Sequence, residues 1–315
     1  MRCARGRSWV PGECPTLALL VLIALLRPEM AAAEPASHPL EFWRKVKADG
    51  FAVPASESPL SLILELSASL GSTDPEMRDG FGYEIPATWI YDKKLLDPPD
   101  LRVLLEKWRA NLRAGLGETG TDSVLLRSFS ALNLSVLAAH DLQSPFLTQG
   151  EFDALLSDAL VYLRDERDVR GYDPPVGWRH SCAHTADLLK FLARSPRLKA
   201  ADQHRIFEAV FAKVTRVGDP VYVWGEDERL ARAILSLVRR KDLDPALTDP
   251  WLGGFLDLHK KASQGAPLDP ALLAADRNGA NLLKSLLTLV SQPTPEPAPA
   301  VEAVRTNLVT VLAKL

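Results

Sequence analysis

The sequence predicts an all-α protein built as an irregular stack of antiparallel helix pairs, as in an armadillo or HEAT solenoid. Apolar residues recur at intervals of three and four along most of the chain, which is the spacing of one helix face. Alternation with a period of two, the pattern of a half-buried strand, is almost absent. Its one example, Val221 to Trp224, is short and equally compatible with a loop.

The helix-like segments follow one another along the chain with short connections. We expect apolar helix faces over 101–112, 124–137, 152–163, 200–216, 227–240, 251–261, 270–290 and 301–314. So many consecutive helices exceed a simple bundle, and a stack of helix pairs is therefore favoured. Because no strict repeat period is present, we expect the stack to be irregular.

Helix starts are marked by capping residues. Thr148 with Glu151 fits a capping box, and Ser58 before Pro59 indicates another start. Asp is a good N-cap, and Pro is tolerated at the first helical position. Several of the seven Asp-Pro pairs therefore predict helix starts; their Asp residues are Asp74, Asp97, Asp173, Asp219, Asp244, Asp249 and Asp269.

The N-terminal segment has the order of a secretory signal peptide. Arginines precede an apolar run from Thr16 to Leu26, and an Ala-x-Ala site ends at Ala33. The apolar run is shorter than the roughly 20 residues of a membrane-spanning helix, so cleavage is favoured over an uncut anchor. We therefore expect export to the periplasm or the medium, with no membrane span after cleavage. The expected divisions are a signal peptide over 1–33, a helical-repeat domain over 34–291, a Pro-rich linker over 292–300 and a C-terminal helix over 301–315.

Cysteine content and charge exclude some classes of protein. Cleavage removes Cys3 and Cys14 and leaves Cys182 as a free thiol of unknown role, so the exported domain must fold without an internal disulfide. The whole chain holds 37 basic and 40 acidic residues, and it has no basic tract. Nucleic-acid binding is therefore not expected.

One short segment, from Trp178 to Asp187, concentrates chemistry. Gly and Pro residues over 171–177 predict a rigid loop, after which a helix is expected to begin. At about 100° per residue, His180, His184 and Asp187 would lie on one stripe of that helix, and Cys182 would point away from them.

Three interpretations of the histidine pair stay open. Two His residues at i and i+4 can hold a divalent metal such as zinc, with Asp187 or another carboxylate as a third ligand. The Glu that follows the first His in metalloproteases is Ser181 here. One His could instead act without metal as a general base. Both could also be structural, hydrogen-bonded to carbonyls and carboxylates.

Charged residues elsewhere have two possible roles. The run from Arg164 to Arg170 and the run from Glu226 to Arg229 are each typical of a solvated surface with ion pairs, but they could also close over the histidines. Arg127 lies beside an apolar helix face, so we expect it to have a carboxylate partner.

These motifs resemble an uncharacterised, mostly bacterial, all-helical family known only as a domain of unknown function. The hallmark R-G-Y…G-W-x-H-x-x-A-H-x-x-D extends here from Arg170 to Asp187. Shorter matching pieces are Gly71–Asp74, Arg78–Asp79, Val124–Ser130 and Glu226–Leu230. Arg179 and Thr185 stand where the family often has Ala and Gly, and these larger residues are expected to narrow the surface that the stripe faces. Many relatives also look cytoplasmic.

The resemblance implies an armadillo-like stack and no particular activity. It suggests that the matched polar residues converge, and with Trp178 they make up the candidate ligand-binding set: Asp79, Arg127, Asp168, Arg170, Trp178, His180, His184, Asp187, Glu228 and Arg229. Our first hypothesis is a binding protein for a peptide, protein or cell-wall-related ligand or another small molecule, held in a groove centred on the histidines. The alternative is a hydrolase that uses the same His pair, with or without metal.

Overall fold

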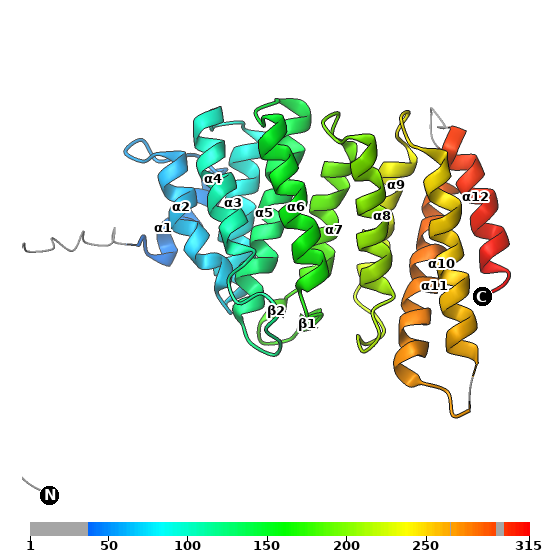
Figure 1. Cartoon of the computed structure of the whole chain (residues 1–315). Coiled ribbons are helices and arrows are strands. Elements are labelled where there is room, and N and C mark those ends of the chain that lie inside the picture. The colour runs from blue at the N-terminus through cyan, green and yellow to red at the C-terminus, as the bar shows by residue number, and fades with distance from the viewer. Residues whose placement is uncertain (1–36, 265, 294–298) are drawn as a thin grey trace, which may run out of the picture. The chain divides into compact units, whose positions relative to one another are not determined.

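Helices make up nearly all of the regular structure in the described part of the chain. The computed structural model describes residues 37–264, 266–293 and 299–315, and its helices belong to one unit, His38–Leu315. The predicted signal peptide and most of the predicted linker lie outside the described residues. The α-helices are α1 (Leu40–Ala48), α2 (Pro59–Ala68), α3 (Glu84–Ala87), α4 (Pro98–Asn111), α5 (Ser123–Gln143), α6 (Gln149–Asp165), α7 (Ser181–Arg194), α8 (Ala200–Val214), α9 (Glu226–Val238), α10 (Thr248–Ser263), α11 (Pro270–Val290) and α12 (Pro299–Leu312), labelled in Figure 1. The all-α class is confirmed.

Shorter turns of helix complete the fold. Two 3₁₀ turns cover Ser69–Gly71 and Pro245–Leu247, and two π-helical segments cover Glu76–Tyr83 and Thr88–Asp92. The sequence pattern did not predict the π-helical segments, because π turns are rare and break the regular spacing of apolar residues.

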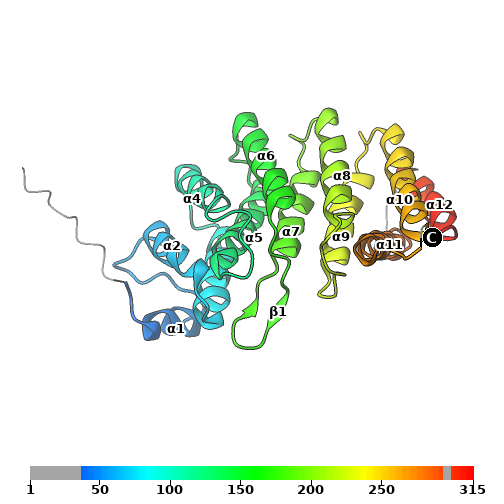
Figure 2. The same cartoon turned by 60° about the horizontal axis from the view of Figure 1, so that its bottom comes forward.

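Alternate helices contact each other. Helix α7 lies between α5 and α9, and α9 in turn contacts α11. On the other side, α8 contacts α6 and α10, and each of these three helices also contacts the odd-numbered helix that follows it (Figures 1 and 2). Helix α12 packs on α10 and α11 through Val304, Leu308 and Val311, which are buried.

Several predicted helix starts are confirmed. Thr148 and Glu151 form a capping box at α6, and Ser58 caps α2 through its side chain. Asp97 caps α4, and Asp269 accepts a hydrogen bond from the first turn of α11. The other Asp-Pro pairs start no α-helix: Asp74 precedes a π-helical segment, Asp173 lies in a hairpin, Asp219 lies in a loop, Asp244 begins a 3₁₀ turn and Asp249 is already inside α10.

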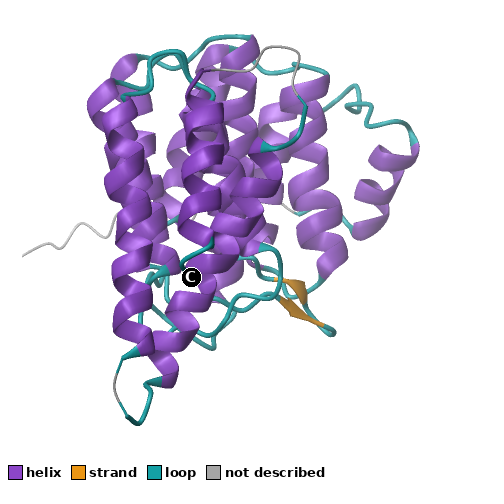
Figure 3. Ribbon diagram, turned by 90° about the vertical axis from the view of Figure 1, so that its right-hand side faces the viewer, coloured by secondary structure: helices purple, strands orange, loops and turns teal. Residues whose placement is uncertain are grey.

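The segment before α7, predicted as a rigid loop from its Gly and Pro residues, is a small hairpin with two-residue strands. Strand β1 (Tyr172–Asp173) pairs antiparallel with β2 (Gly177–Trp178), with Tyr172 opposite Trp178. Figure 3 shows the two strands, in orange, at one end of the helices. Residues 221–224 form a loop. In the described residues, no helix combines the length and the apolar character needed to span a membrane.

Candidate functional site

His180 lies just before α7 and not within it. The helix begins at Ser181, and His180 has a left-handed backbone conformation with φ 49°. The expectation that His180 shares a helical stripe with His184 is therefore wrong, because strand β2 delays the helix start. The left-handed residue nevertheless turns the ring of His180 toward α7, and the ring centroids of His180 and His184 lie 5.6 Å apart.

The ring of Trp178 stacks on His180. The two ring centroids are 4.0 Å apart, and the ring planes differ by only 3°. Nδ1 of His180, which points along the ring plane, is buried without a hydrogen-bond partner in the described residues. Trp178 thus fixes the orientation of the imidazole.

His184 is held by a serine on α5. Its Nδ1 lies 2.8 Å from Oγ of Ser128, and the Ser128 hydroxyl donates its proton to the carbonyl oxygen of Arg179. Ser128 must therefore accept a hydrogen from His184, which places the imidazole proton on Nδ1 and leaves Nε2 as an acceptor. Phe129 meets the ring of His184 edge-on, with the centroids 4.9 Å apart.

Burial keeps both imidazoles neutral. Burial and the positive charge of Arg229 lower the pKa of His180 to about 4, although Asp187 opposes the shift. Burial, His180 and Arg229 hold the pKa of His184 well below its usual value. At neutral pH the pair therefore offers uncharged hydrogen-bonding groups.

Asp187 is engaged by two cations. Its carboxylate pairs with Arg229 on α9, and its other oxygen lies 3.1 Å from Nζ of Lys190. Burial, and then the negative charge of Asp187, raise the pKa of the half-buried Tyr83. Glu228, by contrast, faces solvent and pairs with Arg232.

Arg78 connects this site to the hairpin. It is wholly buried, and its Nη2 donates to the carbonyl oxygen of Val176 at 2.8 Å. Two further bonds join it to Asp79, and its guanidinium lies 4.7 Å from the ring centroid of Phe129. Phe129 therefore contacts both Arg78, which is bonded to the hairpin, and His184. One phenyl ring thus packs against both parts of the site.

Arg127, Asp168 and Arg170 belong to a separate cluster around Glu166. Arg127 is wholly buried and donates to Glu166 at 2.6 Å, so its expected carboxylate partner is present. Asp168 accepts from Arg170 and from the backbone of Gly120. Although burial raises it, hydrogen bonds from Arg170 bring the pKa of Asp168 below its usual value. The structure therefore divides the predicted set into three groups: Asp79, Trp178, His180, His184, Asp187 and Arg229 lie together, Arg127, Asp168 and Arg170 hold loops, and Glu228 lies on the surface.

An exposed group of three aromatic rings completes the site, and the sequence pattern singled out only one of them. Tyr172, Trp178 and Trp224 are 45%, 38% and 44% exposed, and we call them the aromatic patch. Their centroids are 4.9 Å apart for Tyr172–Trp178 and 5.9 Å for Trp178–Trp224. For Trp224, the only indication in the sequence was the short apolar run that ends at this residue, and the pattern of that run resembled a strand.

Gly171 allows the patch to assemble. A Cβ atom at this position would lie 2.0 Å from Cδ1 of Trp224, so the indole packs directly on the backbone. Because no side chain other than hydrogen fits there, the glycine of the motif is required for the approach of the loop that carries Trp224.

Two family departures do not narrow the site. Arg179 points away from the histidines and donates to Asp173 and Asp122. Thr185 is buried, and its hydroxyl donates to the carbonyl oxygen of Ser181. The expectation for both positions is therefore wrong. Cys182 is buried as a free thiol, and burial raises its pKa to about 12, which makes it unreactive.

Around the histidines, the described residues offer a metal ion two imidazole nitrogens and no unpaired carboxylate. In the described part of the chain, no group of three or more His, Cys, Asp and Glu side chains is arranged to hold one. Asp187 already pairs with Arg229, and Nδ1 of His184 is bonded to Ser128. The zinc interpretation thus has only two nitrogens and stays a prediction for metal analysis.

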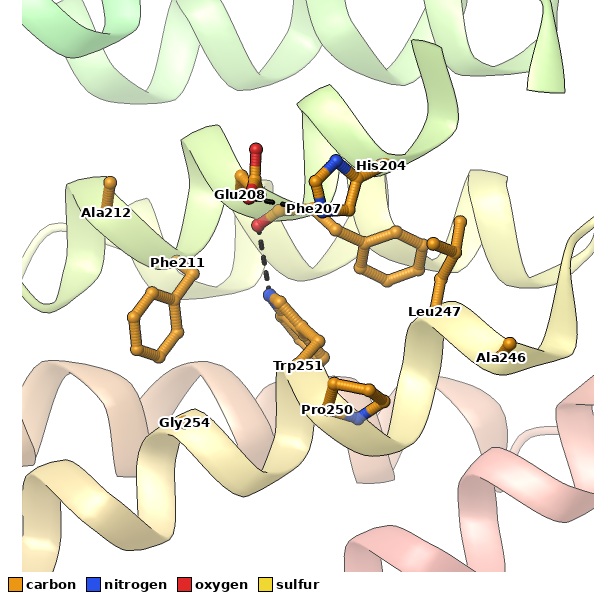
Figure 4. Close-up of a pocket in the computed structure, with 10 residues that line it drawn as sticks. All are labelled: His204, Phe207, Glu208, Phe211, Ala212, Ala246, Leu247, Pro250, Trp251 and Gly254. Atoms are coloured by element: carbon orange, nitrogen blue, oxygen red, sulfur yellow. Dashed lines mark hydrogen bonds and ion pairs between the residues drawn. The ribbon is translucent and has the colours of Figure 1, made fainter. Parts of the chain in front are cut away.

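A separate cavity of about 480 Å³ lies between α8 and α10. Its lining is mainly apolar, as Figure 4 shows: His204, Phe207, Glu208, Phe211, Ala212, Ala246, Leu247, Pro250, Trp251 and Gly254. Trp251 donates from its indole nitrogen to the carbonyl oxygen of Phe207 at 3.0 Å. No lining residue belongs to the set predicted from the sequence.

Comparison with known proteins gives a family and no activity. The family described as "Protein of unknown function (DUF2785)" matches residues 112–288, which include the hairpin, the aromatic patch and both histidines. No curated protein and no solved structure matches the chain.

Proposed function

We propose that this chain, which belongs to the DUF2785 family of proteins of unknown function, is an exported helical-repeat binding protein. Its ligand contacts the aromatic patch and the neutral His180 beside it. The observation that carries the proposal is the exposure of three mutually packed aromatic rings directly beside buried, oriented polar groups. Large aromatic side chains next to a few fixed polar groups are typical of ligand sites.

The support beneath the patch favours binding. Arg78 and Gly171 hold the hairpin and the Trp224 loop close together. A surface that is ordered before the ligand arrives loses less entropy on binding, so a rigid base increases affinity. Similar exposed rings without such support would collapse onto the surface.

The polar edge of the site suggests the class of ligand. The imidazoles are neutral, and Arg229 with Asp187 offers donors and acceptors at the same edge. A ligand with an apolar face and many hydroxyl groups matches rings beside such mixed partners. We therefore propose a glycan, such as a cell-wall oligosaccharide.

Two further expectations belong to this proposal. The alternating contacts of α5, α7, α9 and α11, and of α6, α8 and α10, support an armadillo- or HEAT-like stack. The residues 1–33 support export by the order of their charged, apolar and small residues. Export would bring the aromatic patch into contact with cell-wall polymers.

Calorimetric titration with N-acetylglucosamine oligomers tests the proposal. We expect saturable binding to the wild type and about tenfold or weaker binding to Trp224→Ala, because truncation of a central Trp removes a large part of an interface. Leu273→Ala, at an exposed apolar residue on α11, is the matched control and should bind as the wild type does. Equal binding by all three proteins would overturn the site, and binding of a proline-rich peptide in place of the oligomer would overturn the ligand class.

In the hydrolase alternative, His184 would have to activate a nucleophile, and the hydroxyl beside it in the described residues is not suited to that role. Ser128 is the hydroxyl within reach, but it is wholly buried, and its proton is directed to the Arg179 carbonyl. A serine nucleophile must be accessible to substrate and must give its proton to the base. The alternative therefore stays a prediction, tested by product analysis in the same titrations.

A further inference from the structure

A second polar site lies at the other end of α7 and α9. The two helices run in parallel, since Asp187 in the middle of α7 meets Arg229 in the first turn of α9, and farther along both helices Arg194 donates to Ser236. Along α7, Asp187 and Arg194 are about 10 Å apart, and the hairpin with Tyr172 and Trp178 lies farther away, before the first residue of the helix. A cavity of about 510 Å³ opens here, lined by Arg194, Pro196, Ser236 and the run Arg239–Asp242.

Of the four cationic residues that line the cavity, Arg240 already has hydrogen-bond partners within the protein. Arg240 binds Asp242, the carboxylate of the lining, through two bonds of 2.8 Å and 2.9 Å. It also donates to the carbonyl oxygens of Ala193 and Ser195 at the end of α7. Arg240 therefore neutralises both the carboxylate and the exposed carbonyls of the helix end.

The other three cations retain free donors. Arg194 makes a single hydrogen bond, from Nε to Oγ of Ser236 at 3.1 Å. Within the described ranges, Arg194, Arg239 and Lys241 make no ion pair. The terminal nitrogens of Arg194 and the whole guanidinium of Arg239 are available to a ligand in the cavity.

These cations are close enough to affect one another. Desolvation by neighbouring residues, followed by the positive charges of Arg239 and Arg232, lowers the pKa of the exposed Arg194. Arg232 is balanced by Glu228 at 2.6 Å, but Arg194 and Arg239 have no such counter-charge. An anion placed between them would relieve this repulsion, because guanidinium groups bind phosphate oxygens in bidentate geometry.

We propose that this cavity binds a phosphorylated small molecule, with its phosphoryl group held by Arg194 and Arg239. The volume lies within the roughly 300–1,000 Å³ of small-molecule sites and exceeds the need of a phosphate ion alone. The site is independent of the aromatic patch, because it shares no residue with it.

Titration with inorganic phosphate and with glucose 6-phosphate, at constant ionic strength, tests this proposal. We expect saturable binding of both probes, tighter for glucose 6-phosphate. Arg194→Gln and Arg239→Gln should each weaken binding about tenfold or more, since each removes a charge-assisted contact. Arg205→Gln, which removes an exposed arginine paired with Asp202 at 2.8 Å, is the control and should leave binding unchanged.

Two results would overturn the proposal. One is the absence of saturable binding of either probe to the wild type. The other is an equal affinity in the wild type and both variants, which would show adventitious association with the basic surface. Because Arg194, Arg239 and Arg205 are exposed, the three variants should remain folded. A circular dichroism melt in the absence of phosphate verifies this.

Discussion

The two ends of α7 use arginine in opposite ways. Around the N-terminal end, Arg78 and Arg127 are wholly buried, and each is bonded to a carboxylate and to backbone carbonyls. At the C-terminal end, Arg194 and Arg239 are exposed and have no carboxylate partner in the described residues. The buried guanidiniums hold loops that present uncharged rings, whereas the exposed ones are themselves available to a ligand.

The largest expected effect comes from breaking the buried pair of Arg127 and Glu166. Arg127→Met leaves the Glu166 carboxylate buried without its partner, and we expect a loss of about 3–5 kcal/mol in the free energy of unfolding. Urea denaturation measures it. Arg127→Met combined with Glu166→Leu should recover much of the loss, since no buried charge is left. A loss below about 1 kcal/mol in the single variant would contradict the structural role.

The second effect tests how the aromatic patch is assembled. Gly171→Ala places a methyl group against Trp224, so the indole must move, at a cost of about 1–3 kcal/mol of stability. A red shift of the tryptophan fluorescence should accompany it. Gly150→Ala on α6 is the control, because its Cβ atom would meet nothing within 4 Å. An unchanged spectrum for Gly171→Ala would show that Trp224 does not pack there.

The third effect is a loss of folding stability in acid, which we expect to arise at the N-terminal end of α7, where the two histidines lie. An unfolded His takes up its proton near pH 6.5, whereas folded His180 does so only near pH 4. Between these values the unfolded chain binds more protons, so stability falls by about 1–3 kcal/mol as the pH is lowered. The charged groups that act on the pair are Asp187, Arg229 and Arg78.

The variant His180→Asn with His184→Asn should flatten this dependence. Asn tolerates the left-handed backbone at position 180, and at 184 its amide can still donate to Ser128. Urea denaturation at pH 7 and pH 4.5 gives the comparison, with the exposed His204→Asn as control. An equal loss of stability in the double variant and the wild type would refute the assignment of the acid response to this pair.

The smallest effect is expected at the C-terminal end. Arg194→Gln and Arg239→Gln should each change stability by no more than about 0.5 kcal/mol, because both side chains are exposed and neither makes an ion pair in the described residues. Thermal melts without phosphate measure this. A loss of several kcal/mol would assign these arginines the same structural role as Arg127.

Local patterns predicted the helices well and the site only in part. Thr148 and Glu151 fixed the start of α6, because capping depends on neighbouring residues alone. The position of His180 was missed because two short strands, visible only through pairing across a turn, delay α7. The packing of Trp224 on Gly171 joins residues far apart in sequence, so no periodic pattern could reveal it. The expected burial of Arg127 predicted that it would pair with a carboxylate, but it did not identify Glu166 as that carboxylate.

The imidazole NMR signals of the six histidines provide the most direct test of the proposed binding face. The chain would be titrated with an N-acetylglucosamine oligomer at neutral pH. We predict that the signals of His180 and His184 shift in a saturable manner, while those of His204 and His259, on α8 and α10, stay in place. No shift at His180 and His184 at saturating oligomer, or shifts confined to His204, would contradict the account.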